Sequence, residues 1–292
     1  MFQACLHIKN RTENGGDKEM IQKIWVNAKK VSFTLFAALM ANVFSGNLYA
    51  QNTNPNIDPQ AAEILQNMSY FLGSKDEYTF KAEVMFDQLI NSNRKIQYSA
   101  EEKVYLKKKG NMTIEYVSDL GGYKLWFEEG KVTILELPTN LFSIATLPAT
   151  IDQALLKLKE LYGFTPALSD FLFINTFRAL TENVTSGSYF GTSKVFGVRC
   201  DHLAFVQQDI DWQIWVESGK RQIPRKLVIT YKQLPGQPQF IAILKDWVLD
   251  KPITNFAFKA DIPNLNQRTD MPEILNKPRI NMGSVRSSGR NF

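Results

Sequence analysis

The feature that most constrains the fold is a block of four apolar runs within residues 198–248. Short polar breaks separate the runs, which contain the segments CDHLAF, DWQIWVESG, IPRKLVITYK and FIAILKDWV. β-Branched and aromatic residues are common in all four, and the block holds three of the five tryptophans. Runs of this length and composition predict four antiparallel strands joined by hairpins.

A second β-rich region precedes this block. In the segment EYTFKAEVMF, Tyr78, Phe80, Ala82, Val84 and Phe86 share one face, whereas mostly polar residues share the other. This period-two alternation is typical of a sheet with one face in water. Four further strands are predicted after it, at residues 96–106, 112–117, 123–128 and 132–137.

Helical periodicity occurs before and between the two β regions. Asp58 can cap a helix that continues to residue 72 and has Pro59 at its first position. Residues 151–162 carry apolar side chains at spacings of three and four, which predicts an amphipathic helix that ends at Gly163. Residues 170–180 form a second apolar segment that we also expect to be helical.

The predicted strands number about eleven, with five before the helices and six after them. A strand at residues 189–195 opens the second group, and a short strand at 255–258 ends it. Because most strands are apolar on one face only, the sheet has to curl, and the helices are available to cover that face. The predicted fold class is therefore α+β, a curled antiparallel sheet with helices over its concave apolar face.

The amino terminus has the order of a signal peptide. Basic residues precede an apolar run of fourteen residues, 31–44, and small residues follow it up to Ala50. A membrane-spanning helix needs about 20 apolar residues, so this run favours a signal peptide over an uncleaved anchor. We expect a signal peptide at residues 20–50, cleavage between Ala50 and Gln51, and export to the periplasm with no membrane-spanning segment afterwards.

Residues 1–19 are polar and precede Met20, which would itself be an ordinary signal-peptide start. They are a dispensable extension, or translation begins at Met20. The chain has 34 basic and 29 acidic residues, a net charge of +5, and residues 1–50 hold six of the basic and three of the acidic residues. The remaining 28 basic and 26 acidic residues differ by only +2. This balance gives no case for nucleic-acid binding, which usually needs a clustered basic face.

Catalytic chemistry is limited by what remains after the signal peptide is removed. Cys200 and His202 are then the only cysteine and the only histidine, so a disulfide within the chain and a metal site built from several histidines are both excluded. The two residues point to the same face of a strand, with Cα atoms roughly 6.5 Å apart. A packed core pair is favoured, and an active thiol–imidazole pair is the alternative.

Paired carboxylates and tryptophans were also considered. Asp211 and Glu217 share a face, but about 20 Å of strand separates them, which exceeds the span of a glycosidase pair. Trp212 and Trp215 have opposite parity, so one should face the core and the other the outside. We therefore predict no catalytic residue, no metal and no cofactor.

The motifs of residues 198–248 resemble a bacterial family of predicted periplasmic proteins of unknown function. The resemblance spans about residues 61–262, and the family is placed with the lipoprotein-carrier fold of the LolA/LolB type. That fold is an eleven-stranded half-barrel with helices over its apolar side, and members of the wider group bind lipid chains or lipoproteins. The residues that carry the resemblance are Cys200, Asp201, His202, Asp211, Trp212, Trp215, Pro224 and Arg225.

The combined prediction is a non-enzymatic periplasmic binding protein with a half-barrel domain at residues 57–263 and a flexible basic tail at 264–292. Its partner would be a lipid, an acyl chain or a lipoprotein segment held in an apolar cavity under the helices. An envelope interaction or sensor module, with a protein partner and no small ligand, is the alternative. Strand parity and helix periodicity select the lining candidates: Phe80, Val84, Phe86, Tyr98, Ile114, Leu155, Leu158, Trp212 and Ile214.

Overall fold

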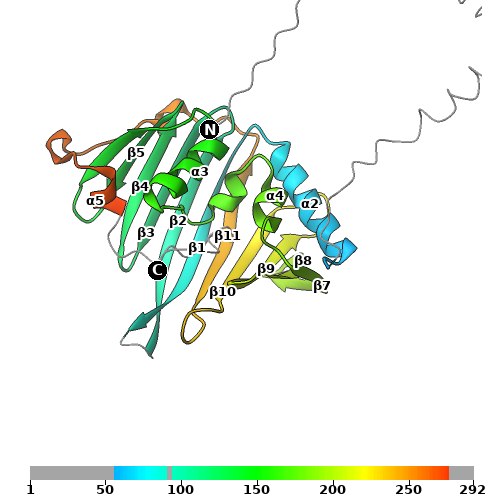
Figure 1. The fold of residues 1–292 in the computed structure, drawn as a ribbon. Coiled ribbons are helices and arrows are strands. Elements are labelled where there is room, and N and C mark those ends of the chain that lie inside the picture. The colour runs from blue at the N-terminus through cyan, green and yellow to red at the C-terminus, as the bar shows by residue number, and fades with distance from the viewer. Residues whose placement is uncertain (1–55, 91–93, 276–292) are drawn as a thin grey trace, which may run out of the picture. The chain divides into compact units, whose positions relative to one another are not determined.

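A computed structural model describes residues 56–90 and 94–275 of the chain, and all described strands belong to one antiparallel sheet (Figure 1). The strand order across the sheet is β6-β5-β4-β3-β2-β1-β11-β10-β9-β8-β7. The first group comprises β1 Glu77–Ile90, β2 Arg94–Lys107, β3 Asn111–Ser118, β4 Gly121–Glu128, β5 Lys131–Glu136 and β6 Phe142–Thr146. The second comprises β7 Ser186–Val195, β8 Val198–Val206, β9 Ile210–Glu217, β10 Pro224–Tyr231 and β11 Gln239–Leu249.

Each group is a meander in which consecutive strands are neighbours, and pairing of β1 with β11 joins the two groups into one sheet. The predicted fold class is confirmed, and eleven strands are present among the described residues. The distribution differs from the prediction, because six strands precede the helices and five follow them. Strand β6 was missed, since its segment FSIAT is only five residues long.

The strand predicted at residues 255–258 is wrong. Asn255–Phe258 is a 3₁₀ helix, labelled η3. Its two phenylalanines are two positions apart and would share a face in a strand, yet Phe258 is buried and Phe256 is exposed. The carbonyl of Ala257 accepts a hydrogen bond from the Thr113 hydroxyl at 2.8 Å, so a side chain of β3 fixes this segment.

The two long helices begin and end where their capping residues predicted. Helix α2, Pro59–Gly73, starts after Asp58, whose carboxylate accepts a hydrogen bond from the Gln60 N–H at 2.8 Å. Helix α3, Ile151–Tyr162, is followed by Gly163 in the left-handed conformation at φ 61°. A glycine adopts this conformation without the steric cost of a Cβ atom, which explains the helix end.

The single helix predicted at residues 170–180 is two shorter ones. A 3₁₀ helix, η2, covers Ser169–Leu172, and helix α4 covers Thr176–Thr181. Asn175 starts the second helix, because its side-chain oxygen accepts a hydrogen bond from the Arg178 N–H at 2.9 Å. Capping by Asn therefore interrupts an apolar segment that the sequence pattern treated as continuous.

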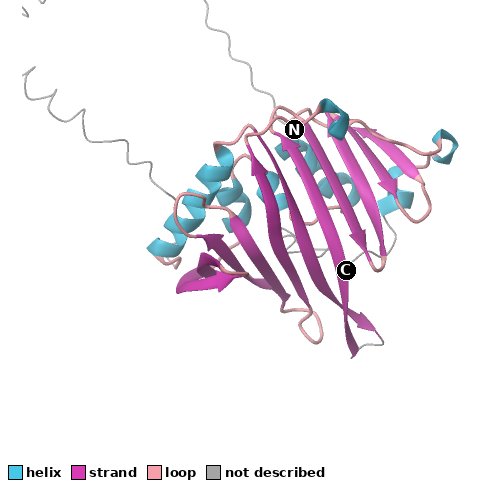
Figure 2. Cartoon of the chain, turned by 180° about the vertical axis from the view of Figure 1, so that it is seen from behind, coloured by secondary structure: helices cyan, strands magenta, loops and turns pink. Residues whose placement is uncertain are grey.

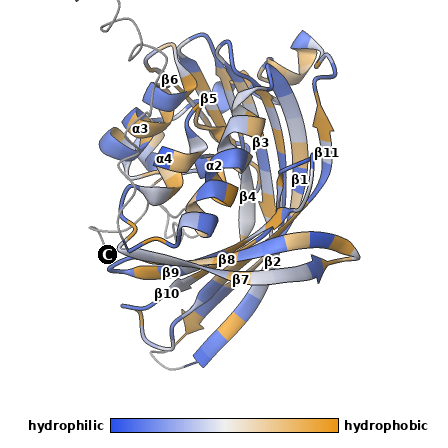
Figure 3. Cartoon of the chain, turned by 90° about the vertical axis from the view of Figure 1, so that its right-hand side faces the viewer, coloured by the Kyte–Doolittle hydropathy of each residue, from blue (hydrophilic) through white to orange (hydrophobic). Residues whose placement is uncertain are grey.

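Helices α2, α3 and α4 all lie on the concave face of the curled sheet. Figure 2 shows the opposite side, where the strands lie in front of these helices, and Figure 3 shows the sheet curving around them. Side chains from both layers form one apolar cluster between them. The fold therefore buries one side of a half-barrel under a layer of short helices, as alternation in the strands predicted.

The carboxyl-terminal segment covers part of the convex face. It runs through η3 and the 3₁₀ helix η4, Leu265–Gln267, to a parallel bridge between Phe142 and Arg268. Ile262 packs there against a second apolar cluster, formed by Trp126, Leu135 and Phe142. The convex face of β4–β6 is thereby shielded from water.

Helix α5, Met271–Leu275, corrects the prediction of a flexible tail from residue 264. Its Ile274 side chain is fully buried, and Met271 and Leu275 also join the main core. Burial of these apolar side chains holds the segment in place. The basic composition of the whole tail did not indicate this contact with the core. The rest of the tail and the predicted signal peptide lie outside the described residues.

Candidate functional site

The side chains predicted to line an apolar cavity come together on the concave side. Eight of the nine belong to the main buried cluster, and Tyr98 packs against it. The Phe86 and Tyr98 rings are 5.9 Å apart, and the Trp212 ring stacks at 4.2 Å on Phe205. Strand parity and helix periodicity therefore identified the residues of this face correctly, and their role as ligand contacts stays a prediction.

Most of this face is tightly packed in the conformation described. Ile114, Leu158, Trp212 and Ile214 have no exposed surface, so protein atoms surround them on all sides. Phe86 and Tyr98 keep some exposure near the far ends of β1 and β2. A chain-like ligand could reach the middle of the concave face only if the helices moved away from the sheet.

One polar side chain interrupts the apolar concave face. Glu102 has 0% exposure, and neither of its carboxyl oxygens has a hydrogen-bond partner among the described residues. Its place in the register is opposite Ala82 on β1 and Tyr116 on β3, with Tyr123 of β4 next in the same row. Burial raises the pKa of Glu102 well above its ordinary value, because an apolar environment disfavours the carboxylate.

Tyr116 shares the environment of this carboxyl group. Burial, and then the charge of Glu102, raise the pKa of the Tyr116 hydroxyl. The Tyr116 and Tyr123 rings stack at a centroid distance of 5.5 Å. Two tyrosines and the Glu102 carboxyl group thus lie side by side in an otherwise apolar surface.

The residues that carried the family resemblance are divided between the two faces. Trp212 is fully buried on the concave side. Cys200, His202 and Trp215 lie on the convex side, since His202 is paired with Trp215 and the intervening residues alternate. The predicted opposite orientation of the two tryptophans is confirmed.

The carboxylates of this group are held by neighbouring polar side chains. Asp201 accepts hydrogen bonds from the hydroxyls of Ser218, at 2.7 Å, and Tyr189, at 3.1 Å. Asp211 forms an ion pair with Lys232 at 2.8 Å. Both carboxylates therefore have structural partners.

The thiol and the imidazole have separate surroundings. Cys200 is fully buried and donates to the carbonyl of Val198 at 3.5 Å, and burial raises the pKa of its thiol to about 11. The His202 Nε2 atom lies 3.0 Å from the side-chain oxygen of Gln213, and the His202 ring stacks on Trp215 at 4.1 Å. A thiol with a raised pKa is a poor nucleophile, so these contacts favour the packed-pair interpretation.

Charged residues extend the convex cluster. Arg225 donates to the Glu217 carboxylate from Nε at 2.8 Å and forms an ion pair with it, and both side chains are largely buried. Pro224 starts β10 opposite Val216, and the ammonium group of Lys226 lies 4.5 Å from the Trp215 ring centroid. Trp215 therefore lies between His202 and Lys226. Its contacts with these two side chains hold the indole ring in place on the outer face of the sheet.

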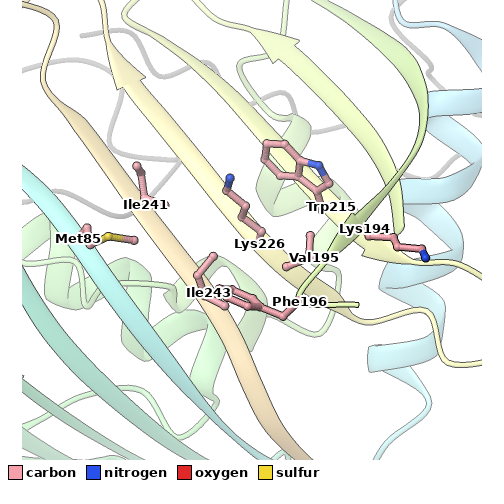
Figure 4. Close-up of a pocket in the computed structure, with 8 residues that line it drawn as sticks. All are labelled: Met85, Lys194, Val195, Phe196, Trp215, Lys226, Ile241 and Ile243. Atoms are coloured by element: carbon pink, nitrogen blue, oxygen red, sulfur yellow. The ribbon is translucent and has the colours of Figure 1, made fainter. Parts of the chain in front are cut away.

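A pocket of about 380 Å³ adjoins this wall on the convex face (Figure 4). Its lining joins three parts of the fold, namely the outer side of β1 and β11, the outer side of β9 and β10, and the hairpin between β7 and β8. Small-molecule sites have volumes of about 300–1,000 Å³. The lining residues are Met85, Lys194, Val195, Phe196, Trp215, Lys226, Ile241 and Ile243.

Sequence reasoning missed both Glu102 and most of this pocket. Glu102 falls between Ala100 and Val104 on the inward parity of β2, so the acidic break in an apolar series was a visible signal. The pocket had no such signal, because it depends on how the β7–β8 hairpin folds over the sheet. Among its residues, only Trp215 was a candidate site residue in the sequence analysis.

The fold and the residues of the concave face define a half-barrel protein of the predicted type. A family model described as "Predicted periplasmic protein (DUF2092)" matches residues 61–271. The match covers more than two thirds of the chain, and the chain belongs to this family. A search of curated proteins finds no match.

Several solved structures are similar over most of their length. LprF from Mycobacterium bovis has 13% identity and a TM-score of 0.41, with 71% of this chain and 97% of that chain covered. An uncharacterized conserved protein from Thermus thermophilus has 12% identity and a TM-score of 0.43, with 72% and 98% covered. A LolA superfamily protein from Nitrosomonas europaea has 11% identity and a TM-score of 0.34, with 68% and 97% covered.

At these identities and TM-scores the likeness carries no information about ligand or partner. The family description is that of a periplasmic protein. Within residues 56–90 and 94–275, no helix is long and apolar enough to cross a bilayer.

Proposed function

We propose that this protein is a non-enzymatic periplasmic binding protein for an apolar ligand. The ligand is a lipid, an acyl chain or the lipid-bearing segment of a lipoprotein, and it lies between the concave face of the sheet and helices α2, α3 and α4. Its affinity comes from burial of apolar surface, at about 0.8 kcal/mol for each CH₂ group. Signal-peptide cleavage between Ala50 and Gln51 belongs to this proposal.

The observation that carries the proposal is the buried carboxyl group of Glu102. A buried polar group without a partner costs about 1–3 kcal/mol of stability, and native proteins hold few of them. Departures of this kind from the pattern of a buried strand are expected at functional or strained sites. A ligand with an apolar body and a hydroxyl or carbonyl group would give Glu102 the missing partner.

Access to this face requires the helix layer to open. Hydrogen bonds hold the layer on the sheet at a small number of points. The Tyr78 hydroxyl donates to the Phe171 carbonyl at 2.6 Å, and the Lys108 ammonium group donates to the Leu72 and Gly73 carbonyls. At the start of α2, the Asp58 N–H donates to the Gly187 carbonyl at 2.9 Å. The remaining attraction is apolar and non-directional, and a hydrocarbon chain can replace it without a loss of contact area. The closed conformation is thus the ligand-free state of the proposed cycle.

Native mass spectrometry of protein purified from its own envelope fraction tests the proposal. We expect an added mass that corresponds to a lipid or acyl chain and that organic extraction removes. Glu102→Leu should change which lipid is retained, with a loss of hydroxyl-bearing species, whereas the exposed control Glu101→Gln should retain the same lipid. A ligand-free protein with no affinity for acyl probes, or one that copurifies with another protein instead, would overturn it.

A further inference from the structure

The turn between β7 and β8 places a large aromatic residue where the backbone disfavours one. Val195 pairs with Val198, so the turn has two central residues, Phe196 at φ 46° and Gly197 at φ 84°. Hairpin turns with two positive φ values prefer Asn, Asp or Gly at both positions. A bulky side chain with positive φ is a genuine outlier, and outliers of this kind gather at functional sites.

Burial of the Phe196 side chain does not offset this unfavourable backbone conformation. It is 82% exposed, and nearby Phe190 on the same hairpin is 63% exposed. Yet Phe196 lines the outer pocket, and Figure 4 shows its ring directed towards Ile243 on β11. A bulge between Tyr189 and Thr192, with Gly191 at φ 85°, lies within the same hairpin and allows it to bend over the sheet.

The pocket combines apolar walls with the ammonium group of one lysine, Lys226. Met85, Val195, Ile241 and Ile243 supply aliphatic surface, and Trp215 supplies an aromatic wall. Lys226 forms no ion pair with any described residue, and its ammonium group lies over the Trp215 ring. Lys194 also belongs to the lining, but Figure 4 shows its ammonium group directed away from the other lining side chains. An anion bound here would meet an ammonium group that no carboxylate neutralises.

Two acidic side chains next to the pocket already have partners. Glu83, opposite Ile243 in the sheet, forms an ion pair with Lys245. Glu217, at the end of β9, is paired with Arg225. The charge nearest to the apolar lining is therefore the ammonium group of Lys226, which favours a negatively charged ligand.

We propose that this outer pocket binds the anionic head and first methylene groups of a single-chain amphiphile, such as a fatty carboxylate or an alkyl phosphate. The head lies at the Lys226 ammonium group, and the chain lies against Ile241, Ile243 and the Phe196 ring. This site is on the face of the sheet opposite the helices. It is independent of the ligand proposed for the concave face.

Calorimetric titration with dodecanoate and dodecyl phosphate, each below its micelle concentration, tests this proposal. Dodecanol serves as the neutral control ligand. We expect Lys226→Gln to weaken binding of both anions about tenfold, because one charge-assisted contact is lost. We expect Phe196→Asn to weaken it by about tenfold as well, through lost apolar contact.

Phe196→Asn separates binding from folding, because Asn is favoured at this turn position and should keep or raise the melting temperature. Phe256→Asn is the matched control, since Phe256 is 78% exposed on η3, outside the pocket, and its loss should leave affinity unchanged. Anion binding that is unchanged in the Phe196 and Lys226 variants would overturn the outer site, as would a loss of dodecanol binding in Lys226→Gln equal to the loss of anion binding. Dodecanol binding that Lys226→Gln leaves unchanged reports on the concave face and not on the outer pocket. Preference for one anion identifies a carboxylate or a phosphate as the head group.

Discussion

Glu102 allows a quantitative test of how the concave face is built. Because burial raises its pKa above the ordinary 4.5, the folded protein holds a proton that the unfolded chain releases above that pH. The folded state is then favoured below pH 4.5, and stability falls as the pH rises towards the pKa of the folded state. The slope from this one group reaches about 1.4 kcal/mol per pH unit.

Two substitutions distinguish the effect of proton binding by Glu102 from the effect of its unpartnered carboxyl oxygens. Glu102→Gln removes the titration, so the free energy of unfolding should lose this part of its pH dependence. Glu102→Leu also removes the unpartnered oxygens, so it should stabilise the protein at pH 8 by about 1–3 kcal/mol. Leu has a similar size, and the neighbouring side chains in the register are the small Ala82 and the flat Tyr116.

Urea unfolding between pH 5 and pH 8 measures both effects. Glu101→Gln is the control, because Glu101 lies on the opposite face of the same strand and is exposed. This control should keep the pH dependence of the natural protein. The reasoning is refuted if Glu102→Gln retains the full pH slope, or if Glu102→Leu is less stable at pH 8.

Three further predictions concern the core, the lid and the thiol. Gly187→Ala should lose about 1–3 kcal/mol of stability in chemical denaturation, because its new Cβ would lie 2.5 Å from a ring carbon of Phe205; an unchanged midpoint would contradict the packing. Tyr78→Phe removes only the hydrogen bond to the Phe171 carbonyl, so it should lower the free energy of unfolding by about 1 kcal/mol. It should also speed uptake of a neutral fluorescent lipid in stopped flow. Slower uptake would show that this contact does not hold the helix layer on the sheet. Labelling of Cys200 at pH 8, followed by peptide mass spectrometry, should be slow until the protein unfolds. The reason is that a pKa of about 11 leaves roughly one Cys200 thiol in a thousand as thiolate. Fast labelling of the folded protein would support an active Cys200–His202 pair instead.

The sequence was most informative where local chemistry decides the structure. Alternation in β1 predicted which side chains face inward, and the capping residues Asp58 and Gly163 predicted the ends of two helices. These signals depend on neighbours in the chain. They therefore survive in a single sequence without knowledge of tertiary contacts.

The sequence was least informative where distant segments meet. The 3₁₀ helix at Asn255–Phe258 depends on a hydrogen bond to Thr113, and burial of Ile274 depends on the core that it joins. The outer pocket brings Met85 together with Phe196, which lies more than a hundred residues away. The periodicity of side chains within each segment does not predict this contact between distant parts of the chain.

Covalent capture of a neutral lipid tests the central claim most directly. A long-chain alcohol that carries a diazirine at mid-chain would be photolysed with the purified protein, and the labelled peptides would be mapped by mass spectrometry. The account predicts label on inward-facing residues of β1 and β2, such as Phe86 and Tyr98, and on helix α3 around Leu155. Label confined to the convex hairpin around Phe196, or no specific label, would contradict it.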